Sequence, residues 1–191
     1  MASRTQIVCL CEGRKGKSID EVFINRLMKS LQPAWLRPWP GSNVIRLDPC
    51  GGRKEVVEKL PAELAHCLGA GSHTTLMVWA DCDDNCDNPD ALKALFWKEA
   101  QAQAITNEQF ERVVFIFAKD RIENWIEFLT TGNTDESKEG PRVKHNREAA
   151  EAAKNLASLC RENKPVSNMP TSLQWSCKNW RRLVEGMKTA R

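Results

Sequence analysis

Short apolar runs separated by amphipathic stretches dominate the pattern of this chain. Four such runs occur, and the second is the weakest; they lie at residues 7–10, 44–47, 75–80 and 113–118. The stronger runs are rich in β-branched or aromatic residues and are apolar at nearly every position, so both faces of each strand are expected to be buried. This pattern predicts the strands of a mainly parallel sheet that is covered by helices on both faces.

Helical spacing follows each run. Ser18 and Glu21 form a capping box before the first helical stretch. A second stretch, at 54–68, is expected to break or restart at Pro61, since proline is best tolerated in a first helical turn. Further helices are expected to begin near residues 89 and 122 and to occupy 146–161 and 172–187.

Buried faces can also be assigned within these helices. The helix opened by Pro89 is expected to bury Leu92, Leu95 and Phe96. The helix near residue 122 has its own apolar side, made of Trp125, Ile126 and Leu129.

The alternation of strands and helices predicts a doubly wound α/β fold with right-handed crossovers. We expect an α/β domain over residues 1–130. The polar segment 131–144 contains two glycines and a proline and is expected to be an exposed loop. Residues 131–191 are therefore expected to form a loop and a C-terminal helical extension packed on the same domain.

Composition narrows the class of protein. The 191 residues carry a formal net charge of +3, which by itself does not identify a nucleic-acid partner. No apolar run approaches the ~20 residues of a membrane span and no signal peptide precedes the first strand, so we expect a cytoplasmic protein without a membrane partner. Of the eight cysteines, Cys82 and Cys86 are four apart, but no second pair or well-spaced histidine completes a zinc site, and we expect buried, reduced thiols.

Acidic side chains follow three of the apolar runs. Glu12 follows the first run, and Asp81 and Asp83 follow the third. Glu123 comes shortly after the fourth. Ligands of open α/β sheets bind outside the carboxyl ends of the strands, so these side chains are expected to meet at one edge. Crowded carboxylates repel one another unless a cation compensates, and oxygen ligands suit Mg²⁺ or Mn²⁺.

Helix capping is the alternative role for acids at such turns. That role suits Asp84, Asp87 or Asp120 taken singly. It explains less well a glutamate followed by glycine together with two aspartates separated by one residue.

Glu12-Gly13 after a first strand and Asp81-Cys82-Asp83 after a third resemble the TOPRIM domain of primases, topoisomerases and OLD-type nucleases. The resemblance covers about residues 5 to 130. Residues 122–125 resemble the acidic helix start of small stand-alone TOPRIM proteins, and Lys144 resembles the basic residue that precedes a later helix in them.

The resemblance implies functions for these residues. Glu12, Asp81, Asp83 and Glu123 would bind metal, and Lys144 would offset charge on a phosphate. The implied activity is a metal-dependent endonuclease that hydrolyses DNA or RNA, and the implied partner is a separate ATPase subunit in antiviral defence. The chain contains no tyrosine, which excludes a tyrosyl-linked topoisomerase mechanism within it.

Basic residues next to the first acid allow two interpretations. Arg14, Lys15 and Lys17 would attract a nucleic-acid backbone under the nuclease interpretation. The same segment, 13–18, otherwise resembles a P-loop of a nucleotide-binding protein, but Cys11 occupies the position of the first glycine. A non-catalytic TOPRIM-like interaction subunit is a third possibility. The sequence leaves open DNA or RNA, single or double strands, and the oligomeric state.

Overall fold

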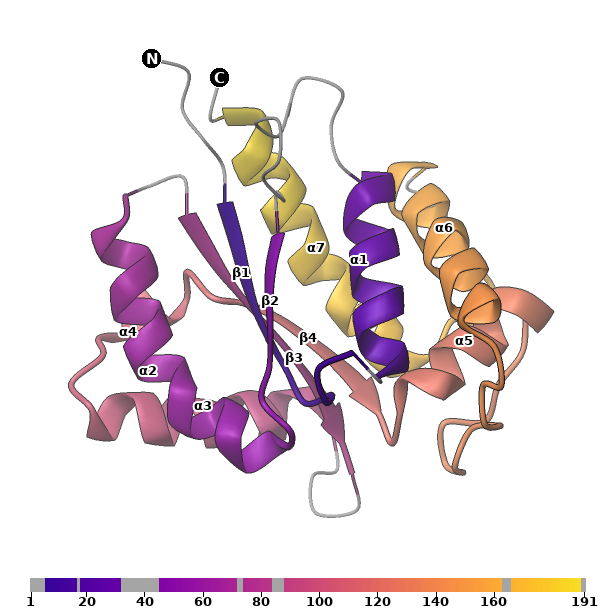
Figure 1. Cartoon of the computed structure of the whole chain (residues 1–191), viewed down its shortest axis with the longest axis horizontal. Helices are drawn as coiled ribbons and strands as arrows, with labels where there is room; N and C mark the ends of the chain where they lie inside the picture. Colours follow the sequence, from indigo (N-terminus) through magenta and orange to yellow (C-terminus); the bar gives the residue numbers. More distant parts are fainter. Residues whose placement is uncertain are drawn as a thin grey trace.

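The computed structural model describes residues 6–16, 18–31, 45–71, 74–83, 88–162 and 166–189. Its centre is a sheet of four parallel strands in the order β2-β1-β3-β4 (Figure 1). The strands are β1 Gln6–Cys11, β2 Ile45–Pro49, β3 Thr74–Cys82 and β4 Val114–Lys119. The expected α/β class and parallel sheet are confirmed, and each apolar run forms the strand expected of it.

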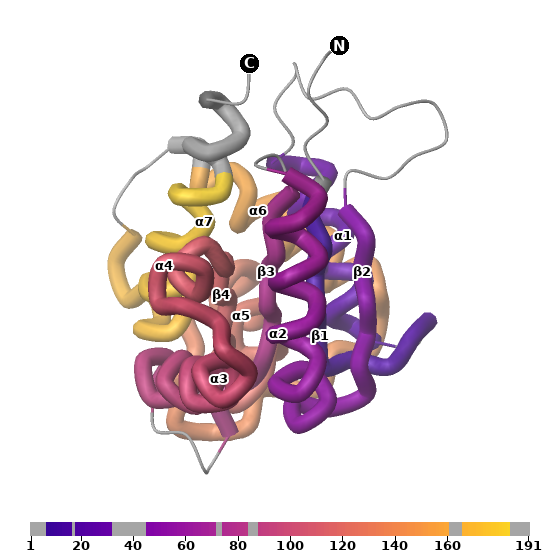
Figure 2. Tube along the Cα trace, turned by 90° about the vertical axis from the view of Figure 1, so that its left-hand side faces the viewer, coloured from indigo at the N-terminus to yellow at the C-terminus, as the bar shows by residue number. Residues whose placement is uncertain are grey.

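Helices cover both faces of the sheet. They are α1 Ile19–Leu31, α2 Arg53–Gly69, α3 Pro89–Ala102, α4 Asn107–Phe110, α5 Ile122–Thr131, α6 Asn146–Glu162 and α7 Thr171–Thr189. Helices α2, α3 and α4 lie on one face, and α1, α5 and α6 lie on the other (Figures 1 and 2). Helix α7 runs along β4 and contributes side chains to the cores on both faces.

Each face of the sheet has its own hydrophobic core. Trp79 of β3 lies at the centre of the core beneath α1, α5 and α6, and is 1% exposed. Its ring meets those of Phe23, Trp125 and Trp180 edge to face, at centroid distances of 5.8, 5.7 and 6.2 Å. Such aromatic contacts add to the burial of their apolar area. Because α6 and α7 supply part of this core, the C-terminal helices and the sheet share one packed interior.

Local sequence rules mispredicted some details. Helix α2 is continuous through Pro61, so the expected break is wrong; the apolar side chains of Leu60 and Leu64 on either side are buried and hold both halves against the sheet. Leu95 is 48% exposed rather than buried, because α3 turns Leu92, Phe96 and Ala100 toward the sheet. The short helix α4 was not expected.

Helix α7 covers the outer edge of β4, the last strand of the sheet. Ser176 Oγ accepts a hydrogen bond from Phe117 N at 3.0 Å and donates one to Phe117 O at 3.1 Å. Both groups are buried. The serine therefore satisfies backbone groups that an edge strand would leave unpaired.

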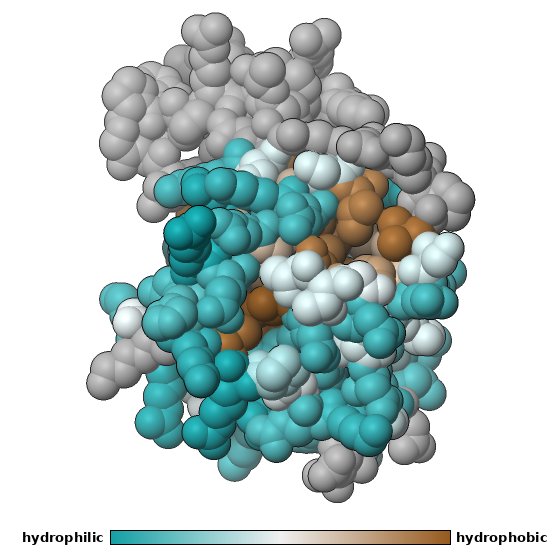
Figure 3. Space-filling view, turned by 90° about the vertical axis from the view of Figure 1, so that its right-hand side faces the viewer, coloured by the Kyte–Doolittle hydropathy of each residue, from teal (hydrophilic) through white to brown (hydrophobic). Residues whose placement is uncertain are grey.

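The side of the molecule that carries α5 and α6 is largely hydrophilic, with apolar residues visible near the centre and toward the upper right of the view (Figure 3). Among the residues described, no helix is long and apolar enough to cross a membrane.

Candidate metal centre

Glu12 and Asp81 meet at the carboxyl edge of the sheet. Strands β1 and β3 are parallel neighbours with Cys11 opposite Trp79, so the segments that follow them leave the sheet side by side. The Oε1 atom of Glu12 accepts a hydrogen bond from Asp81 N at 3.0 Å. Two motifs separated by 69 positions in the chain are thereby brought into direct contact.

Asp20 joins this pair, although the sequence pattern did not single it out. A Cβ atom on Gly13 would collide with Ser18 Oγ and come within 3.2 Å of Asp20 Oδ2. The absence of a side chain at Gly13 therefore lets the start of α1 approach the end of β1. Ser18 Oγ donates to Asp20 Oδ2 and accepts from Asp20 N, at 3.1 Å for the latter bond.

The expected capping box has a different arrangement. The carboxylate of Glu21 accepts from Gly16 N, and Ser18 binds Asp20 instead. In a P-loop, backbone N–H groups of this segment would bind phosphate. Here the N–H of Gly16 binds an anionic side chain instead, which disfavours the nucleotide-binding alternative.

Burial and mutual repulsion dominate the electrostatics of these acids. Burial raises the pKa of Asp81 well above its ordinary range, and the nearby Asp20, Glu12, Glu123 and Asp120 carboxylates raise it further. Its Oδ1 atom is buried, and no hydrogen-bond partner for it exists in the described part of the chain. A buried carboxylate without a partner is costly when ionised.

Burial also dominates the pKa of Glu12. Burial raises its pKa from 4.5 to about 7, although the hydrogen bond from Asp81 N and the charge of Arg53 act in the opposite direction. Burial also raises the pKa values of Asp20 and Glu123. For each of these carboxyl groups, burial therefore outweighs the hydrogen bonds and the positive charges that favour the ionised form.

Asp120 and Glu123 approach from the end of β4. Asp120 adopts a left-handed backbone conformation with φ of 62°, and its N–H donates to Cys82 O at 2.6 Å. Helix α5 begins after Arg121, which makes no side-chain capping bond, so Asp120 does not cap this helix. Its Oδ2 atom is instead buried without a hydrogen-bond partner among the described residues.

Asp83 is turned toward α2. Its Oδ1 atom forms an ion pair with Arg53 Nη1 at 2.7 Å, and its side chain is 51% exposed. The same Nη1 atom lies 3.5 Å from Asp81 O. Asp83 is close enough to raise the pKa of Glu12, but its carboxylate is engaged by a cation of the protein.

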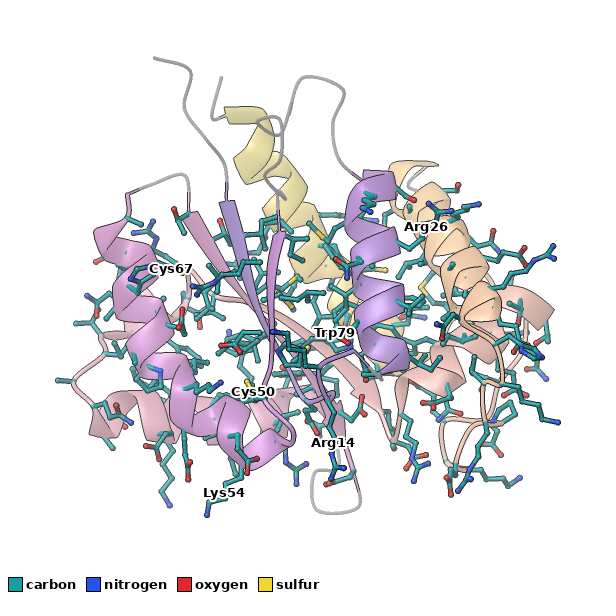
Figure 4. All side chains as sticks on the ribbon, viewed as in Figure 1. Arg14, Arg26, Cys50, Lys54, Cys67 and Trp79 are labelled. Atoms are coloured by element: carbon teal, nitrogen blue, oxygen red, sulfur yellow. The ribbon has the colours of Figure 1, made fainter. Side chains whose placement is uncertain are left out.

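The predicted basic residues are exposed where the structure describes them. Arg14 and Lys15 are exposed on the loop between β1 and α1, and Figure 4 shows Arg14 near the lower ends of the strands and Lys54 at the start of α2. Lys144 is exposed in the segment before α6, and within the described residues it forms no ion pair with the acids. Lys17 lies outside the described residues, as do Asp84 and Asp87.

The described acidic side chains are of the chemical type that binds a hard divalent cation, but their present positions do not form a metal site. Within the ranges that the structure describes, no group of three acidic, thiol or imidazole side chains is close enough to hold a metal ion as the side chains stand. The donors are nonetheless all carboxylate oxygens, and two of their buried oxygen atoms, on Asp81 and Asp120, lack partners. This donor set suits Mg²⁺ or Mn²⁺ after side-chain rotation.

Comparison of the chain with protein-family models, with curated proteins and with solved structures found no significant match.

Proposed function

We propose that this protein is a TOPRIM-like nuclease that uses Mg²⁺ or Mn²⁺ to hydrolyse phosphodiester bonds of nucleic acid. The observation that carries the proposal is the direct contact of Glu12 with Asp81. Both have raised pKa values, and Oδ1 of Asp81 is buried without a hydrogen-bond partner among the described residues. Folding places negative charge where it is costly, and a cation would remove that cost. Structural ion pairs do not explain such a site.

Glu12 and Asp81 would hold the ion, together with Asp20 or Glu123. Asp83 is the further ligand that the resemblance implies, and it would have to leave Arg53. When bound, a divalent ion lowers the pKa of water and offsets charge on the phosphate.

Basic residues would bind the nucleic-acid substrate. Arg53, once released by Asp83, would bind a substrate phosphate bidentately. Arg14, Lys15 and Lys17 would attract the nucleic-acid backbone, and binding would weaken as salt concentration rises. Lys144 would offset charge on the phosphate.

Cleavage assays test the proposal. The protein is incubated with plasmid, single-stranded DNA and RNA, in Mg²⁺, Mn²⁺ or EDTA. We expect metal-dependent cleavage that falls about 100-fold or more in Asp81→Asn, since a lost ligand removes several kcal/mol of charge stabilisation. The matched control is Asp135→Asn, which makes the same substitution at an exposed residue paired with Lys138. Cleavage by Asp81→Asn at the rate of the native protein would contradict the assignment of the site.

The ATPase partner is a separate part of the proposal, and its support is the resemblance alone. Coexpression with a candidate ATPase, followed by gel filtration, tests it. Comigration supports a complex, and separate elution of two folded proteins contradicts it for that candidate.

A further inference from the structure

Two cysteines that lie far from the acidic edge face each other between the C-terminal helices. Cys160 lies near the end of α6 and Cys177 lies in the middle of α7. Their sulfur atoms are 4.0 Å apart. Both residues are partly buried at the border of the hydrophobic core, so the sulfurs are held in place without being fully sealed from solvent.

The two thiols have unequal surroundings. Either thiol can donate in this contact, and the guanidinium of Arg181 lies near both sulfurs; the contact and this positive charge together lower the pKa of Cys160. The same contact and burial raise the pKa of Cys177. A thiolate is the nucleophilic form of cysteine, so Cys160 is the thiol prepared to react first.

The other described cysteines lack this combination. Burial raises the pKa of Cys11 to about 12 and that of Cys67 to about 11. Cys50 is also partly buried and lies near the Lys59 ammonium, but burial raises its pKa and its Sγ donates to the backbone oxygen of Asp48 at 3.3 Å. Proximity to a second thiol, partial access and a nearby cation therefore coincide at Cys160 and Cys177.

We propose that Cys160 and Cys177 form an oxidation site, at which a peroxide produces an intramolecular disulfide. The Cys160 thiolate attacks one peroxide oxygen, the O–O bond breaks, and the departing oxygen takes a proton to leave as water or an alcohol. Cys160 is then a sulfenic acid. The Cys177 sulfur attacks the Cys160 sulfur, the S–O bond breaks, and a second water leaves with the Cys177 proton. Two thiols are oxidised by two electrons, and one peroxide is reduced.

The geometry requires only a small movement. A disulfide is about 2.0 Å long, so the sulfur atoms must approach by about 2 Å. The bond would tie α6, which packs against α1 and α5, to α7, which closes the edge of β4. It would close a loop between positions 17 apart in sequence. The lost freedom of the unfolded chain predicts a rise in Tm of about 5–10 °C on oxidation.

Peptide mapping tests the site directly in the full chain. The protein is treated with hydrogen peroxide at about one to ten equivalents, free thiols are blocked with iodoacetamide, and trypsin is added without reductant. Trypsin cuts after Arg161, which separates residues 155–161 from 162–178. We expect these two peptides to be found as one linked species, about 2 Da lighter than their sum, that dithiothreitol separates. Recovery of both cysteines in alkylated form, with oxidation confined to other cysteines, would overturn the proposal.

Variants distinguish the pair from general oxidation. Cys50→Ser is the matched control, because it removes a partly buried thiol that lies outside the pair, and it should retain the linked peptide and the rise in Tm. Cys160→Ser and Cys177→Ser should lose both. If either serine variant folds poorly, the peptide map of the native protein still decides the question. A covalent dimer that increases with protein concentration, in place of the intramolecular link, would also refute the assignment.

Discussion

Replacement of Glu12 by glutamine is expected to stabilise the metal-free protein at pH 8. Glutamine keeps an oxygen that can accept the hydrogen bond from Asp81 N, now 3.0 Å from the glutamate oxygen. It removes the negative charge that burial opposes. The substitution therefore tests whether the acidic edge stores unfavourable charge, which is the premise of the proposed metal site.

The magnitude follows from the pKa of Glu12, which burial raises from 4.5 to about 7. Between these values the folded protein holds a proton that the unfolded chain has released, so stability falls as pH rises from about 4.5 to 7 and levels off above. At 1.4 kcal/mol for each tenfold step, the full penalty is about 3 kcal/mol. Because the carboxylate is still partly exposed to water, we expect a gain of about 1–3 kcal/mol at pH 8 and a smaller one, below about 1 kcal/mol, at pH 5.

Urea denaturation in EDTA at pH 5 and pH 8 measures this difference. Glu108→Gln, at an exposed residue of α4, is the control and should change little at either pH. A loss of stability in Glu12→Gln at pH 8, or an equal gain at both pH values, would refute the electrostatic reasoning. Mg²⁺ should then raise the Tm of the native protein at pH 8 and raise that of Glu12→Gln less. Without a Mg²⁺ effect, the charge argument survives but the metal proposal does not.

Two further substitutions test the packing around the site. Gly140→Ala should lower the free energy of unfolding by about 1–3 kcal/mol, since its Cβ would lie 2.7 Å from the backbone N of Asn124 in the helix that carries Glu123; Gly69→Ala, where a Cβ meets open space, should not. Ser176→Ala should cost about 1–3 kcal/mol by leaving a buried N–H of β4 unpaired, and the exposed Ser158→Ala should be neutral. Urea denaturation measures both pairs, and equal effects within either pair would contradict the corresponding contact.

The arrangement of strands could be anticipated because it depends on local composition. Runs that are apolar on both faces form strands in a covered parallel sheet, and the helical spacing between them forms the covering layers. Parallel neighbours end at the same edge, so the meeting of Glu12 with Asp81 also follows from the chain order. The TOPRIM assignment and the nuclease activity stay predictions.

Other features of the site depend on which side chains find one another in space. Asp83 faces Arg53, and nothing in the spacing of 30 positions between them indicates this pair. The role of Asp20 depends on how closely α1 approaches the end of β1 at Gly13, which is a matter of backbone geometry.

The sequence by itself determined the four strands, their parallel arrangement and the edge at which acids gather, because periodicity and strand ends are properties of neighbouring residues. Only the tertiary structure decided that Pro61 stays within a continuous helix, and that Cys160 meets Cys177. These outcomes depend on packing between segments distant in the chain. There, the burial of many apolar side chains outweighs a local preference, and the fold sets the separation of side chains that no pattern in the sequence relates.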